Sequence, residues 1–177
     1  VLSLCGLICA FPVLLIFVIF GFFDTGAPIF RQKRLGQNQK LFMLIKFRTM
    51  REDTESVPTH LVNPSAITAF GRFLRRTKLD ELPQLWNVLK GEMSLVGPRP
   101  GLPSQDALTK ARALQDVYSV KPGITGLAQV KGIDMSTPEL LARTDAQMIA
   151  EMSVTNYFRF IFLTVIGNGK GDRIKQK

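Results

Sequence analysis

The distribution of apolar residues divides the chain after Phe23. No charged residue occurs up to that position, and an uninterrupted apolar helix of this length can span the hydrocarbon core of a membrane. Pro12 lies at the centre of the run, where proline removes one helical hydrogen bond, so we expect a kink there. Taken alone, this pattern favours a plain spanning helix over one that turns back within the membrane. We therefore separate a membrane-embedded segment, residues 1–23, from a single functional unit, residues 24–177.

Beyond the first segment, the spacing of apolar residues predicts a hairpin followed mainly by helices. Residues 28–33 and 41–47 flank the polar turn Gly36-Gln37-Asn38-Gln39, which is typical of two paired strands. Apolar side chains at helical spacing then predict helices over 67–78, 104–118, 137–152 and 154–166. Polar residues 52–65 and the turn-rich stretch 121–126 predict loops. The expected fold class is α+β and predominantly helical.

Two of these helices are candidates for contact with a membrane surface. Residues 67–78 combine aromatic and basic side chains, which fits either an anionic lipid interface or an ordinary surface helix with a core stripe. Residues 154–166 are apolar but too short to span, so an interfacial or buried helix is expected.

The charge of the chain supports an anionic membrane partner. Lys and Arg number 23 against 14 Asp and Glu, a net charge of +9, yet 46% of residues are hydrophobic. Between Asp24 and Glu52 every charged residue is basic, a bias that places the soluble part on the cytoplasmic side. The two cysteines, Cys5 and Cys9, lie in the apolar run and are interpreted as packing residues rather than a disulfide.

Two short motifs carry candidate chemistry. Asp80 and Glu81 are adjacent carboxylates, which disfavour each other's ionisation unless a cation or metal lies beside them. The alternative is a structural role, with Asp80 as the N-cap of a helix and Glu81 in its first turn. Arg99 stands between two prolines, so its guanidinium would be rigidly presented to a phosphate. A nucleophile, a base, a metal and a phosphate clamp are the components of phosphoryl transfer.

Four motifs occur in an order that resembles the bacterial sugar transferases, the monotopic phosphoglycosyl transferases. The motifs are Lys46-Phe-Arg-Thr-Met50, Leu79-Asp-Glu-Leu-Pro-Gln84, Gly97-Pro-Arg-Pro100 and Pro122-Gly-Ile-Thr-Gly-Leu-Ala-Gln129. The resemblance covers the chain from the apolar run to about Gln129. It reverses the topology expected from Pro12 alone: the implied segment is a Pro-broken, re-entrant membrane helix with both ends on the cytoplasmic side.

The resemblance also implies a reaction. Members of this family move a phosphosugar from a UDP-sugar to undecaprenyl phosphate, release UMP and begin a surface glycan at the cytoplasmic face of the bacterial inner membrane. They form a covalent aspartyl-phosphosugar and require Mg²⁺. By position, Asp80 is the implied nucleophile and Mg²⁺ ligand, and Glu81 the base. The implied substrate-binding residues are Arg99, Lys46 and Arg75, although a solvated or lipid-facing charge stays an alternative for the last two.

Three positions depart from the family pattern. Phe11-Pro12 stands where relatives have Ser-Pro, and Lys121 where they often have Arg. Ile133 follows Gly132 where relatives have an arginine, and its side chain cannot bind an anion. Neither the sugar nor the oligomeric state follows from the sequence.

Two other function classes compete with this interpretation. A catalytically silent, membrane-anchored scaffold of the same fold would not need the intact site motifs. A nucleic-acid binder is disfavoured because the basic residues flank an apolar segment and the aromatic residues cluster in apolar runs.

Overall fold

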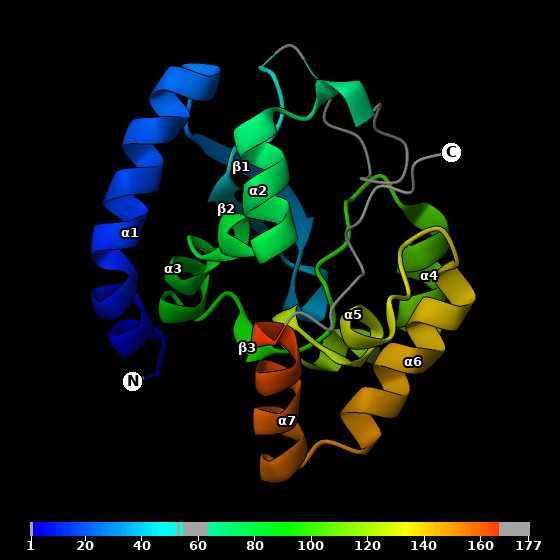
Figure 1. Ribbon diagram of the computed structural model, residues 1–177. Coiled ribbons are helices and arrows are strands. Elements are labelled where there is room, and N and C mark those ends of the chain that lie inside the picture. The colour runs from blue at the N-terminus through cyan, green and yellow to red at the C-terminus, as the bar shows by residue number, and fades with distance from the viewer. Residues whose placement is uncertain (1, 53, 55–63, 167–177) are drawn as a thin grey trace. The chain divides into compact units, whose positions relative to one another are not determined.

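The computed structural model describes residues 2–52, 54 and 64–166, so most of the predicted loop over 52–65 lies outside the described part (Figure 1). Its residues form two compact units, each presented separately below. In the described part, the first unit contains residues 2–32, 43–52, 54 and 64–90, and the second contains residues 33–42 and 91–166.

The α+β class with a predominance of helix is confirmed, and the two units share one hairpin. The first unit carries α1 (Leu2–Thr25), the short turn η3 (Pro64–Ala66), α2 (Ala69–Thr77), η4 (Leu79–Glu81) and α3 (Gln84–Leu89). The second carries η1 (Gln37–Gln39), β3 (Ser94–Val96), α4 (Asp106–Leu114), η5 (Val117–Ser119), β4 (Gly123–Thr125), α5 (Leu127–Lys131), α6 (Pro138–Ala150) and α7 (Val154–Val165). The hairpin strands β1 (Ile29–Leu35) and β2 (Leu41–Phe47) run from one unit into the other.

The N-terminal helix α1 is long and apolar enough, over Ser3–Thr25, to cross a membrane. Only 6% of its apolar window is buried, which sets it apart from a core helix of a soluble protein. Helical structure continues on both sides of Pro12, so a break at the proline stays a prediction. Within the first unit, Phe17 of α1 packs edge-on against Phe47 of β2, at a ring-centroid distance of 5.8 Å.

The predicted hairpin is confirmed. Its turn closes where the Gly36 amide donates to the Lys40 carbonyl at 2.8 Å, and Asn38 adopts a left-handed conformation that asparagine tolerates well. The outer side of β2 is covered by a side chain from α3. Asn87, which is completely buried, accepts a hydrogen bond from the Ile45 amide and donates one to the Met43 carbonyl.

The helix predicted over 67–78 is present as α2, which begins two residues later, at Ala69. The Thr68 hydroxyl accepts a hydrogen bond from the Gly71 amide at 2.9 Å, an N-cap, and donates one to the Asp24 carboxylate at 2.6 Å. A Cβ atom on Gly71 would overlap the Thr49 carbonyl, so only glycine allows α2 to approach the Lys46–Met50 segment this closely.

The second unit contains a parallel strand pair that the sequence analysis missed. Ser94 of β3 pairs with Gly123 of β4, and Val96 with Thr125. The stretch 121–126, predicted to be a loop, therefore includes a strand. A Cβ atom on Gly123 would overlap the backbone of Gly97, so this crossing also requires glycine.

Helices α4 and α6 lie side by side in the second unit (Figure 1). The prediction of one helix over 104–118 is partly wrong, because α4 ends at Leu114 and Asp116 turns the chain through a left-handed conformation before η5. Leu114, one of the apolar residues at helical spacing in this stretch, is 86% exposed. Two apolar clusters hold the unit: Val96, Met148 and Phe160 in one, and Leu108, Ala128 and Leu141 in the other.

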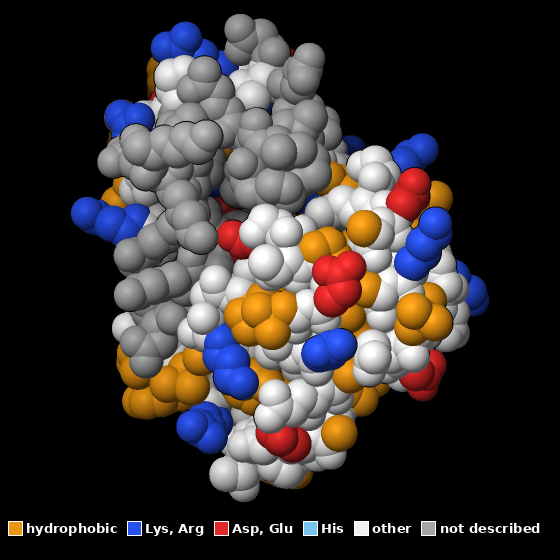
Figure 2. Space-filling view, turned by 90° about the vertical axis from the view of Figure 1, so that its right-hand side faces the viewer, with side chains coloured by type: hydrophobic (Ala, Val, Ile, Leu, Met, Phe, Trp, Pro, Cys, Tyr) orange, Lys and Arg blue, Asp and Glu red, His pale blue; other side chains and the backbone are white. Residues whose placement is uncertain are grey.

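The predicted helix over 154–166 is present as α7, and it carries apolar side chains on both its packed and its exposed face. Phe160 packs into the first apolar cluster, whereas Val154, Phe158 and Phe162 are exposed. On the face of α4 and α6 that Figure 2 presents, acidic and basic side chains are interspersed with apolar ones. The described residues of this face form no continuous basic surface of the kind that nucleic acids bind.

Candidate active site

The first unit contains four of the five predicted site residues. Asp80 and Glu81 lie in η4, immediately after Lys78 ends α2 in a left-handed conformation. Both residues are buried, at 4% and 5% exposed. The alternative of Asp80 as a helix N-cap is wrong, because α3 begins at Gln84 and its N-cap is Pro83. Asp80 and Glu81 are thus buried in a turn before α3, and neither residue caps that helix.

Arg75 extends from the last turn of α2 and is held by a single buried side chain. Its Nε donates a hydrogen bond to the Thr49 hydroxyl at 2.7 Å, and Thr49 is only 3% exposed. Its Nη1 is buried and hydrogen-bonds none of the described residues. A buried guanidinium nitrogen without an acceptor is costly, so this side chain is well suited to an anionic ligand.

Lys46 lies in β2 and is 9% exposed, so the alternative of a solvated charge is wrong for this residue. Its ammonium group lies 5.5 Å from the centre of the Phe30 ring, within the range of a cation–π contact. Arg48 approaches the same ring at 5.6 Å and donates a hydrogen bond to the Ala27 carbonyl at 2.8 Å. The Lys46–Met50 segment therefore concentrates positive charge in the unit that carries the two carboxylates.

The fifth predicted residue, Arg99, belongs to the second unit. It lies in a loop in which four successive backbone carbonyls accept hydrogen bonds. The carbonyls of Pro98, Arg99, Pro100 and Gly101 each accept a hydrogen bond from a different residue. The donors are, in the same order, the Gly123 amide at 2.9 Å, Arg112 Nη1 at 2.8 Å, Arg34 Nη1 at 3.1 Å and the Leu35 amide at 3.0 Å. The rigid presentation expected from the flanking prolines is thus reinforced by the backbone contacts of the loop.

The donor to the Arg99 carbonyl is itself fixed by a buried ion pair. Arg112 Nε and Nη2 both donate to the same oxygen of Asp145, at 3.0 and 2.7 Å. Arg112 is 2% exposed and Asp145 is fully buried. Burial raises the pKa of the Asp145 carboxyl, and the adjacent Arg112 guanidinium opposes that rise. The ion pair between Arg112 of α4 and Asp145 of α6 therefore fixes the guanidinium that binds the Arg99 carbonyl.

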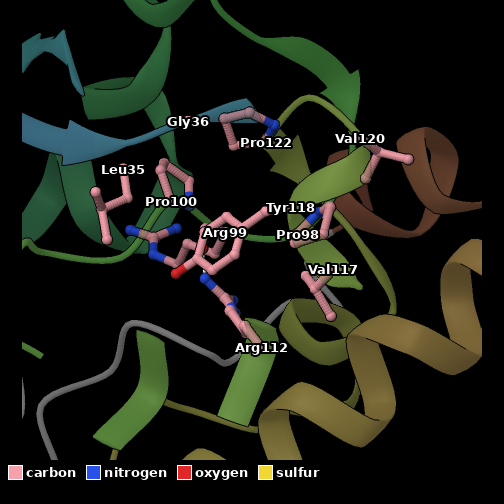
Figure 3. Close-up of a pocket in the computed structure, with 10 residues that line it drawn as sticks. All are labelled: Leu35, Gly36, Pro98, Arg99, Pro100, Arg112, Val117, Tyr118, Val120 and Pro122. Atoms are coloured by element: carbon pink, nitrogen blue, oxygen red, sulfur yellow. Dashed lines mark hydrogen bonds between the residues drawn. The ribbon is translucent and has the colours of Figure 1, made fainter. Parts of the chain in front are cut away.

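Arg99 also lines a small pocket with room for about one water molecule, shown in Figure 3. The walls are mainly apolar and come from the hairpin turn, the Pro98–Pro100 loop and the segment after α4. The polar side chains on the wall are those of Arg99, Arg112 and Tyr118. All of these residues belong to the second unit.

Asp80 and Glu81 are chemically suited to Mg²⁺. This ion prefers carboxylate oxygen, and in phosphoryl-transfer sites one or two carboxylates usually hold it together with substrate phosphates. Within residues 2–52, 54 and 64–166, no group of three or more acidic, histidine or cysteine side chains could form a cage around a metal. The pair therefore fits an ion shared with a substrate rather than a permanent structural site.

The departure at Ile133 has a structural explanation. Its side chain packs against the cluster of Leu108, Ala128 and Leu141. The residue therefore contributes to the core here.

The sequence analysis did not identify Thr49, Arg112, Asp145 or Tyr118. For two of them a signal was available: Arg112 lies four residues after the buried Leu108, and Asp145 four residues after the buried Leu141. A charged residue on the apolar face of a helix predicts a buried polar partner. Thr49 lies within the Lys46–Met50 motif, although no role was assigned to it, and no comparable local signal distinguishes Tyr118.

Comparison with known proteins agrees with the motifs. The chain is 40% identical over 157 residues to the galactosyl transferase CpsE of Streptococcus agalactiae serotype III, covering 80% of this chain and 34% of CpsE. It is 41% identical over 155 residues to the UDP-glucose:undecaprenyl-phosphate glucose-1-phosphate transferase of Xanthomonas campestris pv. campestris, covering 81% and 32%. The uncharacterized sugar transferase EpsL of Bacillus subtilis is 39% identical over 162 residues, covering 90% and 79%.

The chain spans about a third of the length of the first two relatives and most of the third. The family model for bacterial sugar transferases matches residues 1–170, which include all five predicted site residues and the apolar helix α1. The chain therefore belongs to the bacterial sugar transferase family.

Proposed function

We propose that this protein is a phosphoglycosyl transferase that moves a sugar phosphate from a UDP-sugar to undecaprenyl phosphate and releases UMP. The observation that carries the proposal is the pair of buried, adjacent carboxylates Asp80 and Glu81 in η4. Relatives named for this reaction, or for a galactose version of it, support the choice of substrates.

Asp80 acts as the nucleophile. Its carboxylate oxygen attacks the β-phosphorus of the UDP-sugar, the bond from that phosphorus to the bridging oxygen breaks, and UMP leaves. The product is a covalent phosphosugar on Asp80. Asp80 and the substrate phosphates would hold Mg²⁺, which would supply positive charge to offset the negative charge of the diphosphate.

The second half of the reaction regenerates the enzyme. An oxygen of undecaprenyl phosphate attacks the phosphorus on Asp80, which frees the carboxylate and forms the undecaprenyl diphosphate sugar. Glu81 accepts the proton when the attacking phosphate carries one. The buried Lys46, the partly buried Arg75 and the rigidly held Arg99 bind the phosphate groups.

A membrane location follows from the proposed substrates. Undecaprenyl phosphate is a lipid, and a UDP-sugar is a cytoplasmic metabolite, so the reaction takes place at the cytoplasmic face of the bacterial inner membrane. We propose that α1 enters the membrane as a re-entrant, monotopic segment, with α7 lying in the headgroup plane. The exposed apolar side chains of α1 and α7 support this assignment.

Release of UMP tests the proposed function directly. The purified chain in detergent would be incubated with Mg²⁺, undecaprenyl phosphate and, one at a time, UDP-glucose, UDP-galactose and the UDP-N-acetylhexosamines. At least one UDP-sugar should yield UMP and a lipid-linked sugar. Formation of both products over many turnovers should require undecaprenyl phosphate. Absence of both products with every donor would favour the silent-scaffold alternative.

A further inference from the structure

Arg48 is held by three contacts at the point where the chain leaves α1. Its backbone amide donates a hydrogen bond to the Pro28 carbonyl at 2.8 Å, and its Nε donates one to the Ala27 carbonyl at 2.8 Å. Its guanidinium carbon lies 5.6 Å from the centre of the Phe30 ring. All of these residues belong, with α1, to the first unit. The side chain therefore has a fixed place beside the carboxyl end of the apolar helix.

The two terminal nitrogens of this guanidinium are available to a ligand. Arg48 is partly exposed, and only its Nε makes a side-chain hydrogen bond to the part of the chain that the structure describes. None of the described acidic side chains forms an ion pair with it. Arg112 differs, because protein acceptors engage its guanidinium at all three nitrogens. A planar fork with two available donors fits two oxygens of one phosphate group.

The position of Arg48 beside the end of α1 favours the phosphate of a lipid. In the proposed membrane location, the chain leaves the apolar layer where α1 ends, at Thr25, whether the helix spans the membrane or turns back within it. Ala27 and Pro28 follow directly and therefore lie at the level of the lipid headgroups. Since Arg48 is bonded to both, its guanidinium is close to the depth at which lipid phosphates lie.

The segment that carries Arg48 also leads to the catalytic turn. The next residue, Thr49, accepts a hydrogen bond from Arg75 of α2, the helix that runs directly into the Asp80–Glu81 turn. The Lys46–Met50 segment thus connects the chain at the membrane surface with the element that precedes the proposed nucleophile.

A second positive charge lies beside the same aromatic ring. Lys46 Nζ is 5.5 Å from the centre of the Phe30 ring, at nearly the same distance as the Arg48 guanidinium. Two like charges beside one ring repel each other, and a bound anion offsets this repulsion. A phosphate monoester carries up to two negative charges, whereas the phosphodiester of a phospholipid carries one. The headgroup of a polyprenyl phosphate therefore matches this pair of cations better than that of a bulk phospholipid.

We propose that Arg48 binds the phosphate of the lipid acceptor, undecaprenyl phosphate. This inference rests on the proposed function and extends it to recognition of the acceptor. Arg48 then serves the second half of the reaction, in which the lipid phosphate attacks, and not the first half, in which UMP leaves. Kinetic measurements on the two halves separate these roles.

The test measures each half of the reaction in nonionic detergent without added phospholipid. Arg48→Met keeps an apolar stem against Phe30 and removes the guanidinium. With UDP-sugar alone, the variant should form the covalent adduct at a rate within about twofold of wild type. Discharge of the isolated adduct should need about ten- to hundredfold more undecaprenyl phosphate for its half-maximal rate, the expected effect of losing a hydrogen bond between charged groups. Slower adduct formation with an unchanged lipid requirement would place Arg48 at the nucleotide and overturn the proposal.

Two further variants separate acceptor binding from folding and from general charge. Arg48→Lys keeps the charge beside Phe30 but loses the fork, so its lipid requirement should rise only about three- to tenfold, which also provides a test if Arg48→Met does not fold. Arg31→Met removes an exposed positive charge from β1 of the same unit and should leave both halves unchanged. An equal effect of Arg31→Met, or an effect of Arg48→Met that appears only after anionic phospholipid is added, would contradict the proposal.

Binding of the acceptor distinguishes failure of this inference from failure of the proposed function. If the wild type formed no adduct and released no UMP with any UDP-sugar, the proposed function would fail. Native mass spectrometry of the detergent-solubilised chain with undecaprenyl phosphate would still test Arg48. A complex that forms with wild type and Arg31→Met and is depleted in Arg48→Met supports the inference. Equal occupancy in all three proteins, or no complex with wild type, refutes it.

Discussion

Arg112 donates a hydrogen bond from its side chain to the backbone carbonyl of Arg99, at 2.8 Å, while two other nitrogens of the same guanidinium bind Asp145. One buried arginine thus links the ion pair between α4 and α6 to the loop that presents the proposed phosphate ligand. In this arrangement the stability of the second unit and the orientation of Arg99 depend on the same side chain.

The two roles of Arg112 can be separated by substitution. Asp145→Asn leaves the buried guanidinium uncompensated and should lower the free energy of unfolding by about 3–5 kcal/mol. The double variant Arg112→Met/Asp145→Leu replaces the pair with apolar side chains and should recover most of that stability. Its UMP release should stay low, since the Arg99 carbonyl has lost its donor. Thermal unfolding and UMP release measured on the same samples check both outcomes, and full activity of the double variant would refute the positioning role.

The covalent step predicts a mass change. The wild-type protein incubated with its UDP-sugar, in the absence of undecaprenyl phosphate, should gain the mass of one phosphosugar, and Asp80→Asn should gain none and release no UMP. Asp106→Asn, a change at an exposed carboxylate in α4, is the matched control and should form the adduct normally. Full activity of Asp80→Asn would exclude this residue as the nucleophile.

Arg99 should be sensitive to shape as well as to charge. Arg99→Lys keeps the charge but loses the planar fork that binds two phosphate oxygens, so we expect kcat/KM to fall about a hundredfold. Arg72→Lys and Arg76→Lys, at exposed positions of α2, should change it less than about threefold. Comparable losses at all three positions in steady-state assays would indicate general electrostatics instead of a specific phosphate clamp.

Thr49 is predicted to act through Arg75. Thr49→Val removes the oxygen that accepts from Arg75 Nε, and a hydrogen bond to a charged group is worth about 1.5–3 kcal/mol, so kcat/KM should fall tenfold or more. Thr49→Ser keeps the hydroxyl and should retain activity within about threefold. A purely structural role would instead lower the melting temperature of Thr49→Val without changing the KM of the fraction that remains folded.

The re-entrant topology of α1 is tested by labelling. With Cys5 and Cys9 replaced, single cysteines at position 1 and at Phe23, which is 87% exposed, would be probed in intact cells with an impermeant thiol reagent. Neither should react until the inner membrane is opened, since both ends are expected on the cytoplasmic side. Labelling at position 1 in intact cells would establish a spanning helix.

The sequence predicted those helices and strands that have a recognisable pattern of apolar and polar residues within a short stretch. The hairpin follows from a polar turn between two apolar stretches, and α2, α6 and α7 follow from apolar side chains at helical spacing. The strands β3 and β4 were missed because each has three residues and their pairing joins Ser94 to Gly123, far apart in the sequence. A strand this short has no detectable period.

The site could be predicted only in part, for a similar reason. The family resemblance predicts Asp80, Glu81, Lys46, Arg75 and Arg99 as site residues. The residues that position them make contacts across long sequence separations, such as Thr49 with Arg75 and Arg112 with Asp145. Those contacts arise from tertiary packing, which a single sequence does not encode in any short window.

The completely buried Asn87 also covers a strand edge that could otherwise promote aggregation. An unpaired strand edge offers a template on which another chain can add a strand and aggregate. In a two-stranded hairpin such as β1–β2, both edges carry this risk. By bonding to Ile45 and Met43, the Asn87 amide occupies one donor and one acceptor on the outer edge of β2. The helix directly after the Asp80–Glu81 turn therefore also protects the hairpin against intermolecular strand exchange.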